Sequence, residues 1–269
     1  MTNLPHYRLD ALFFTQVEFL DDLLNANAKL KILYHIGPRV ILNQVLKHKE
    51  IIIFANSSNM FELDKRKYGI RPVKAYGGIH IPEQIEVKRI EGEPFKIMAY
   101  GRLSRKGKGT SLVVKACEKL YRMGYNIKLL LFDSPLDEAS REKIQRFDCN
   151  VPFEFVLNHP VQENSSLFAR ADAFVAAEKK GGWSNTAAEA LASGVALIGT
   201  STGTRDFLVH NQTGLRVWRH PYFIRKALER IINDPALART LAANGREKIA
   251  AYSWTRLADF IELYIASRL

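Results

Sequence analysis

Short runs of hydrophobic residues recur along the chain and alternate with stretches in which hydrophobic residues are spaced three or four apart. Most of the short runs are continuously apolar, which is typical of strands buried on both faces of a parallel sheet. The predicted strands comprise residues 11–14, 30–34, 51–55, 73–76, 97–100, 127–132, 153–157, 173–176 and 195–199. Their alternation with helices predicts an α/β protein with doubly wound, Rossmann-like sheets.

A turn-rich segment divides this pattern in two. Residues 77–94 begin with Gly77 and Gly78, are mostly polar, and contain two prolines, so we interpret them as a linker between two lobes. Residues 1–94 then form a partial N-terminal lobe with its linker. Residues 95–269 form a C-terminal lobe that ends in a helix over residues 254–269.

Composition and charge narrow the functional classes. The chain has 269 residues, of which 47% are hydrophobic and 25% charged, so it can form a buried core and is not wholly disordered. The net charge is +11, with +2 in residues 1–94 and +9 in the remainder. This excess favours an anionic ligand in the second lobe, although exposed lysine-rich helices would produce the same balance.

The length of the apolar runs and the cysteine content indicate the cellular compartment. No apolar run approaches the length of a membrane-spanning helix. The two cysteines, Cys117 and Cys149, form neither a disulfide framework nor a metal cluster. We therefore expect a cytoplasmic protein, with at most weak, salt-sensitive contact with the inner face of the membrane.

The first candidate site lies between a predicted strand and a predicted helix at residues 100–110. Its sequence, Y-G-R-L-S-R-K-G-K-G-T, combines glycines with several cations. Backbone amides at a helix N-terminus together with cationic side chains favour a phosphate group, whereas the alternative is a solvated basic loop. The candidate ligands in this loop are Gly101, Arg102, Lys106 and Lys108.

The second candidate site also joins a strand to a helix, at residues 178–194. Two glycines permit close backbone approach, and Ser184 or Asn185 can cap the following helix. Glu189 lies one helical turn further on, where its carboxylate can accept hydrogen bonds from two hydroxyl groups. The candidate residues are Glu178, Gly181, Gly182, Trp183, Ser184, Asn185, Thr186 and Glu189.

These segments resemble the glycosyltransferases of family 4, which are retaining enzymes of the GT-B fold. The resemblance covers the second lobe in order: G-R-L before a helix, G-W-S-N-T-A-A-E-A-L-A-S-G-V, a small-residue loop at residues 199–206, and N-Q-T-G at residues 211–214. Weaker similarity extends back through residues 55–79. The resemblance implies transfer of a sugar from a nucleotide-diphosphate sugar to a carbohydrate or lipid-linked acceptor hydroxyl, with retention and without a metal or cofactor.

The resemblance also implies roles for individual residues. Arg102 matches the arginine that binds the donor diphosphate, and the accompanying lysine is either Lys106 or Lys108, because this loop is one residue longer than the usual pattern. Glu189 matches the carboxylate that binds the ribose. His35, at the end of a first-lobe strand, matches a histidine that faces the donor sugar, although a histidine in this place can also be structural.

The sequence departs from the family pattern in two respects. The carboxylate expected to contact the donor sugar falls on Gly181, and the nearest acid is Glu178, three residues earlier. The first lobe is also short, which is consistent with a small lobe, a truncated product, or a lobe completed by a partner chain.

Two functional hypotheses therefore remain. The first is a glycosyltransferase. The second is a catalytically incomplete subunit that binds the nucleotide sugar and needs a partner chain. Nucleic-acid binding is disfavoured because the sequence contains no recognised module for it.

Overall fold

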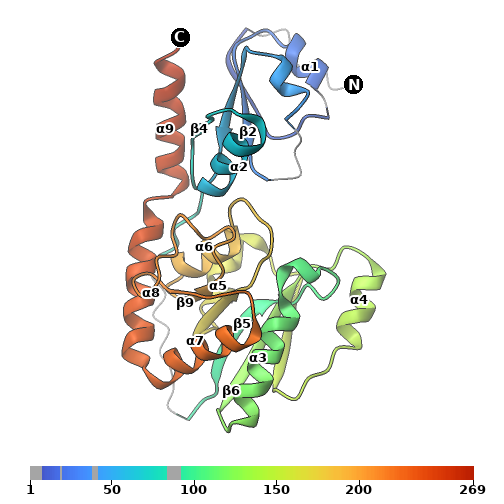
Figure 1. Ribbon diagram of the computed structural model, residues 1–269, viewed down its shortest axis with the longest axis vertical. Coiled ribbons are helices and arrows are strands. Elements are labelled where there is room, and N and C mark those ends of the chain that lie inside the picture. The colour runs from blue at the N-terminus through green and yellow to red at the C-terminus, as the bar shows by residue number, and fades with distance from the viewer. Residues whose placement is uncertain (1–7, 19, 38–41, 84–91) are drawn as a thin grey trace. The chain divides into compact units, whose positions relative to one another are not determined.

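The computed structural model describes residues 8–18, 20–37, 42–83 and 92–269 of the chain (Figure 1). Two compact units are present. Unit 1 comprises Met1–Gly78, Gly181–Trp183 and Tyr252–Leu269, and unit 2 comprises Ile79–Lys180 and Ser184–Ala251. Residues 84–91 of the expected linker lie outside the described ranges.

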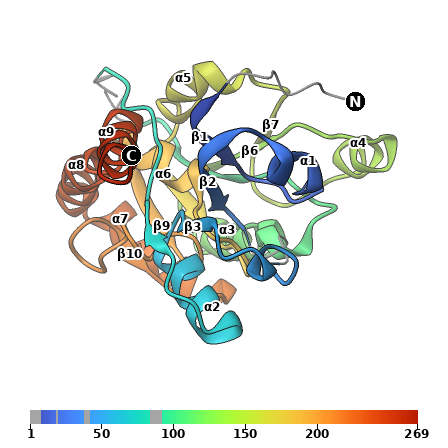
Figure 2. The same ribbon diagram turned by 90° about the horizontal axis from the view of Figure 1, so that it is seen from above.

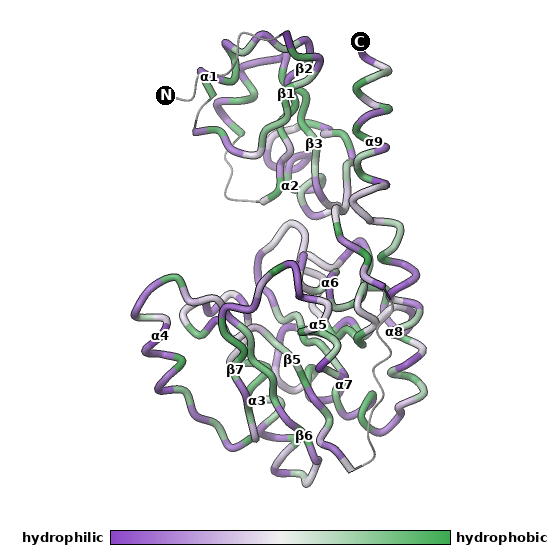
Figure 3. Tube along the Cα trace, turned by 180° about the vertical axis from the view of Figure 1, so that it is seen from behind, coloured by the Kyte–Doolittle hydropathy of each residue, from purple (hydrophilic) through white to green (hydrophobic). Residues whose placement is uncertain are grey.

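Unit 1 contains a four-stranded parallel sheet with the order β1-β2-β3-β4. The continuous apolar pattern correctly predicted these parallel strands; β3 reads I-I-I-F-A and is coloured hydrophobic along its length in Figure 3. The strands are β1 (Leu9–Phe14), β2 (Ala28–His35), β3 (Ile51–Ala55) and β4 (Val73–Lys74). The helices that follow them are α1 (Leu20–Asn25), the 3-10 helix η1 (Val45–Lys47) and α2 (Ser58–Tyr68).

The two faces of this sheet are covered by segments far apart in the sequence. Helices α1 and η1 contribute Leu20 and Val45 to the core on one face. The terminal helix α9 (Trp254–Ala266) packs on the other face through Leu257. Figures 1 and 2 show α1 and α9 on opposite sides of the strands. Unit 1 is therefore built from both ends of the chain.

An aromatic cluster joins α9 to the sheet. Phe54 of β3 is fully buried, and its ring lies 5.0 Å from Tyr264 and 6.3 Å from Phe260 of α9. Phe13 of β1 contacts the same ring at 6.0 Å, edge to face. Aromatic pairs in these geometries add stabilisation beyond the area that they bury, so α9 is a packed part of the first core.

Unit 2 contains a six-stranded parallel sheet with the order β10-β9-β8-β5-β6-β7. The chain first builds outward from β5 through β6 to β7 and then returns to β8 on the other side of β5, which is the doubly wound order. The strands are β5 (Phe95–Tyr100), β6 (Ile127–Asp133), β7 (Phe153–Leu157), β8 (Ala173–Ala176), β9 (Ala196–Gly199) and β10 (Leu215–Arg216). The two-residue strand β10 was not predicted, because it is too short to produce a hydrophobic pattern.

Helices cover both faces of this second sheet. They are α3 (Thr110–Arg122), α4 (Glu138–Gln145), α5 (Asn164–Phe168), α6 (Asn185–Ala192), α7 (Pro221–Asn233) and α8 (Pro235–Ala250), with the 3-10 helices η2 (Lys106–Lys108) and η3 (Val161–Glu163). The predicted helix at residues 110–123 is α3, and its Cys117 is fully buried in the core. Two parallel α/β sheets, the first of them smaller, confirm the predicted fold class. Within the described part of the chain, no helix is both long and apolar enough to cross a membrane.

Candidate functional site

The candidate site of unit 2 lies where the order of its sheet reverses. Strands β5 and β8 are parallel neighbours, with Ala99 paired to Val175, so the loops that follow them leave the sheet at the same edge. The amide of Lys179 donates to the carbonyl of Gly107 at 2.8 Å and joins the two loops. In open α/β sheets, ligands bind at such a point.

A glycine permits this close approach of the two loops. Gly109 has φ +82° and stands at the N-terminus of α3. A Cβ atom there would collide with the carbonyl oxygen of Ala177, which follows β8. Any other residue would therefore separate the first candidate loop from the second.

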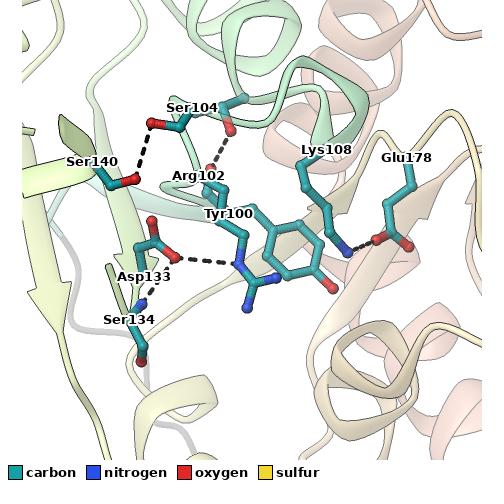
Figure 4. A network of polar contacts seen from close by, with 9 residues as sticks. Tyr100, Arg102, Ser104, Lys108, Asp133, Ser134, Ser140 and Glu178 are labelled. Atoms are coloured by element: carbon teal, nitrogen blue, oxygen red, sulfur yellow. Dashed lines mark hydrogen bonds and ion pairs between the residues drawn. The ribbon is translucent and has the colours of Figure 1, made fainter. Parts of the chain in front are cut away.

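Tyr100, at the end of β5, lies against two of the three candidate cations. The ammonium of Lys108 lies 4.4 Å from the centroid of its ring, and the guanidinium carbon of Arg102 lies 5.7 Å from it. Figure 4 shows the two side chains on either side of this ring. Cation–π attraction therefore holds two positive charges at one point of the sheet edge.

Each of these cations also has a carboxylate partner (Figure 4). Arg102 donates from Nε to Asp133 at 3.2 Å, and Lys108 donates to Glu178. Both carboxylates are buried, whereas the two cationic side chains are partly exposed. The two carboxylates therefore hold the cations in place, and part of each cation remains accessible to a ligand.

The start of α6 lies beside the same tyrosine. The pKa of Tyr100 is raised, chiefly by burial and further by the charge of Glu178. Hydrogen bonding to Thr186 and Ser184 acts in the opposite direction. The amide of Ser184 donates to the carbonyl of Gly203 at 2.8 Å, which ties the loop after β9 to the start of this helix. Ser184 occupies the N-cap position as expected, but its side chain makes no capping hydrogen bond among the described residues.

Further along α6, the carboxylate of Glu189 has a single hydrogen-bond partner among the contacts described. Its carboxylate accepts a hydrogen bond from the side-chain amide of Asn164, the first residue of α5, at 2.9 Å. Burial raises the pKa of Glu189, and this hydrogen bond acts in the opposite direction. The carboxylate is thus held by a neutral donor and retains acceptor capacity for hydroxyl groups.

The two lysines left open by the sequence have different environments. Lys108 is directed at Tyr100 and Glu178, whereas Lys106 has an exposed side chain. The backbone carbonyl of Lys106 accepts a hydrogen bond from Arg219, which also donates to the carbonyl of Ala177 at 2.9 Å. Arg219 therefore braces both loops, and Lys108 is the lysine directed into the site.

In unit 1, His35 is completely buried at the end of β2. Its Nδ1 lies 2.9 and 3.0 Å from the two carboxylate oxygens of Asp64 on α2, and its Nε2 lies 3.0 Å from the carbonyl oxygen of Gly37. Both ring nitrogens therefore have acceptors within the unit. These contacts support the structural alternative for His35.

The glycine-rich segment Gly181–Trp183 also belongs to unit 1. The side-chain amide of Asn59 lies 3.4 Å from the carbonyl oxygen of Gly182. A Cβ atom on Gly182 would lie only 2.7 Å from the carbonyl oxygen of Ile36. The Trp183 ring lies 5.2 Å from that of Tyr252. This segment consequently packs against the loop that follows His35.

Sequence reasoning missed four residues of this arrangement: Tyr100 as the cation support, Asp133, Arg219, and Thr200, whose hydroxyl donates to the carbonyl of Glu178 at 2.9 Å. Polar residues directly after predicted strands were the available signal for Asp133 and Thr200. Arg219 had no signal, because it acts on loops more than 40 residues away in the sequence.

Comparison with known proteins identifies the family of the chain and a relative. Residues 80–248, more than half of the chain, match the glycosyl transferases group 1 family. A capsular polysaccharide biosynthesis glycosyltransferase, CapM of Staphylococcus aureus, is 26% identical over 219 residues, which cover 78% of this chain and 56% of CapM. The chain thus spans little more than half the length of this relative.

Solved structures share the fold at low sequence identity. A glycosyltransferase from Rickettsia africae ESF-5 has a TM-score of 0.78 at 17% identity and covers 95% of this chain and 76% of its own. A TarM variant from S. aureus, solved in complex with UDP among other ligands, has a TM-score of 0.72 at 12% identity and covers 96% of this chain and 56% of its own. These neighbours confirm the expected GT-B architecture.

Proposed function

The chain belongs to the glycosyl transferases group 1 family, and on this premise we propose that it takes part in the transfer of a sugar from a nucleotide-diphosphate sugar to an acceptor hydroxyl, with retention of configuration. The observation that carries the proposal is the convergence of Arg102 and Lys108 on Tyr100, next to the start of α6. We place the donor in unit 2, and we propose that the acceptor is carbohydrate or lipid-linked and that the protein is cytoplasmic.

In the proposed mechanism, the diphosphate is both the recognised group and the leaving group. Negative charge builds up on it as the bond to the sugar breaks. Arg102 and Lys108 stabilise that charge together with the backbone amides at the start of α6. Because the two cations are already held in place, little reorganisation is needed when the charge develops.

Glu178 and Glu189 have different roles in this proposal. Glu178 is 3% exposed and paired with Lys108, which supports a positioning role for this carboxylate rather than direct contact with the sugar. Glu189 binds the ribose hydroxyls, for which its acceptor capacity is suited. The backbone amides of Asn185 and Thr186, at the start of α6, bind the phosphates in this proposal.

The residues of unit 1 are assigned more indirectly. The contacts of His35 with Asp64 and Gly37 support a role in holding the loop that follows β2. That loop contacts Gly182, so we propose that His35 influences the segment Gly181–Trp183 through packing.

The decisive experiment compares UDP with uridine as ligands of the wild type and of single-residue variants, by calorimetry or by thermal shift. Loss of one charge-assisted hydrogen bond to phosphate costs about 1.5–3 kcal/mol. We therefore expect Arg102→Gln and Lys108→Gln to weaken UDP binding by about 10- to 150-fold and to leave uridine binding unchanged. The matched control is Arg105→Gln, because Arg105 is an exposed cation of the same loop.

The same measurement distinguishes the two lysines. Lys106→Gln is expected to resemble the control, since the Lys106 side chain is exposed and its loop contact is made by the backbone. An equal loss of UDP and uridine affinity in Lys108→Gln would identify Lys108 as a scaffold residue. Unchanged affinity for both ligands would refute the proposed diphosphate site.

A second candidate is a nucleotide-sugar-binding subunit that needs a partner chain. It is favoured by Gly181, which stands where the family has a carboxylate, and by the coverage of only 56% of CapM. Assays of donor hydrolysis and transfer separate the candidates. Donor binding without turnover by this chain, followed by turnover when a partner chain is added, would establish the second.

A further inference from the structure

Asn164, the first residue of α5, contacts a carboxylate of the candidate site from a separate segment of the chain. Its side-chain amide donates to Oε2 of Glu189 at 2.9 Å, although 25 residues separate the two positions. Both side chains are half-buried. The contact therefore depends on how α5 is placed against α6, and no local pattern of α6 produces it.

The hydrophobic core sets the position of α5. Phe168 is fully buried, and its ring lies edge to face with Phe174 of β8 at 5.6 Å and with Phe132 of β6 at 6.1 Å. At the start of the helix, the backbone amide of Asn164 donates to the carbonyl of Val161. Because aromatic packing holds α5 on two strands, the side-chain amide of Asn164 is presented to α6 with little freedom.

Within the described part of the chain, the elements around Glu189 supply it with no charged partner. Helix α6 packs chiefly against α5, α8, β8 and β9, and α5, β8 and β9 contain no ionisable side chain. On α8, Arg246 donates to the carbonyls of Ala192 and Pro82, and the other ionisable side chains are exposed. Burial raises the pKa of Glu189, and the hydrogen bond from Asn164 lowers it.

This hydrogen bond has two consequences for the carboxylate. The two oxygens of a carboxylate offer about four acceptor positions, and Asn164 occupies one of them. Rotation of the group would break the bond, so its plane is held. Hydrogen bonding to the charged form also favours that form, which keeps a buried carboxylate ionised. The neighbouring hydroxyl groups of a ribose can then donate to the positions that remain.

We propose that Asn164 is a positioning residue for the carboxylate of Glu189 and thereby makes the site selective for ribonucleoside over 2′-deoxyribonucleoside diphosphates. This inference rests on the proposed function, in which Glu189 binds the ribose. A site built to bind a hydroxyl group rejects the analogue that lacks it, because a buried polar group is then left unpaired. A carboxylate that is free to turn, or that is protonated, distinguishes the two sugars less well.

The test measures the affinities of matched ribonucleoside and 2′-deoxyribonucleoside diphosphates by calorimetry, with the base first chosen by thermal shift among UDP, GDP and ADP. We expect the wild type to bind the ribonucleotide about tenfold or more tightly than its 2′-deoxy analogue, since one hydrogen bond to a charged group is lost. In Asn164→Ala and Asn164→Asp, this preference is expected to fall to about threefold or less. Asn164→Asp keeps the shape of the side chain and replaces the donor by a like charge.

Two further measurements separate positioning from a general effect on folding. The affinity of the wild type falls as the pH is lowered through the pKa of Glu189. This fall is expected at a higher pH in Asn164→Ala, because the group that lowers the pKa has been removed. In a Glu189→Gln background, Asn164→Ala is expected to change affinity little. The matched control is Asn150→Ala, which removes an amide 3.4 Å from the Glu118 carboxylate on the surface and should leave the sugar preference unchanged.

The outcomes distinguish this inference from the proposed function. Absence of binding by all three diphosphates, or equal wild-type affinity for the ribose and deoxyribose forms, would overturn the proposed ribose site and this inference with it. A wild-type preference that persists in both Asn164 variants, with an unchanged pH profile, would overturn this inference alone. Melting temperatures equal to that of Asn150→Ala establish that the variants are folded.

Discussion

Replacing Asp64 by asparagine tests whether the buried pair of unit 1 holds its fold together. His35 and Asp64 are both fully buried, and the two acceptors around the imidazole are the Asp64 carboxylate and the Gly37 carbonyl. Asp64→Asn keeps the shape of the side chain and removes the carboxylate that lies against Nδ1 of His35.

The expected cost follows from this burial. Losing a hydrogen bond to a charged group lowers the free energy of unfolding by about 1.5–3 kcal/mol. Unit 1 has roughly 100 residues, for which each kcal/mol corresponds to about 4–8 °C in melting temperature. We therefore expect the melting of unit 1 to fall by about 6 °C or more in Asp64→Asn. Asp10→Asn is the matched control, because Asp10 pairs with Lys29 on the surface of the same sheet, and such an exposed pair contributes little to stability.

Hydrogen exchange of the amides in β2 and β3 is the suitable measurement, because it follows unit 1 separately from unit 2. A double-mutant cycle with His35→Asn measures the coupling between the two side chains and is expected to give a large interaction energy. An Asp64→Asn protein that unfolds like the wild type would refute the structural reasoning. If such a protein also lost turnover, His35 would be assigned to the reaction itself.

Two further predictions concern single residues of the second candidate site, residues 178–194. Because burial raises the pKa of Glu189, its ionisation opposes folding, and the stability that it contributes is present at acid pH and is lost as the pH rises through the raised pKa. Thermal melting should therefore show Glu189→Gln to be at least as stable as the wild type at pH 7, with a smaller advantage near pH 4. The donor affinity of this variant should fall, and unchanged donor affinity would rule out the ribose role. Gly182→Ala should destabilise unit 1 by about 1–3 kcal/mol in denaturant unfolding, because the added methyl group would meet the Ile36 carbonyl at 2.7 Å. Gly107→Ala has open space around the new atom and should change the unfolding free energy little, so equal effects of the two substitutions would contradict the packing argument.

The sequence by itself determined the local structure and the fold class. Continuous apolar runs identified parallel strands, because a strand covered on both faces needs hydrophobic residues at every position. The same local chemistry located the loop at residues 101–109, where glycines and cations directly precede a helix. It also placed Cys117 in the core, because its spacing on α3 matches that of the other buried residues.

Only the tertiary structure decided how these segments act together. The sequence left both Lys106 and Lys108 open, and the difference in their surroundings comes from Tyr100 and Glu178, which are brought together by the pairing of β5 with β8. Likewise, the pairing of His35 with Asp64 requires α2 to fold back over β2. Hydrophobic periodicity records which face of an element is buried, but not which partner it meets. Contacts between residues distant in the chain arise from strand order and helix packing, which no local pattern specifies.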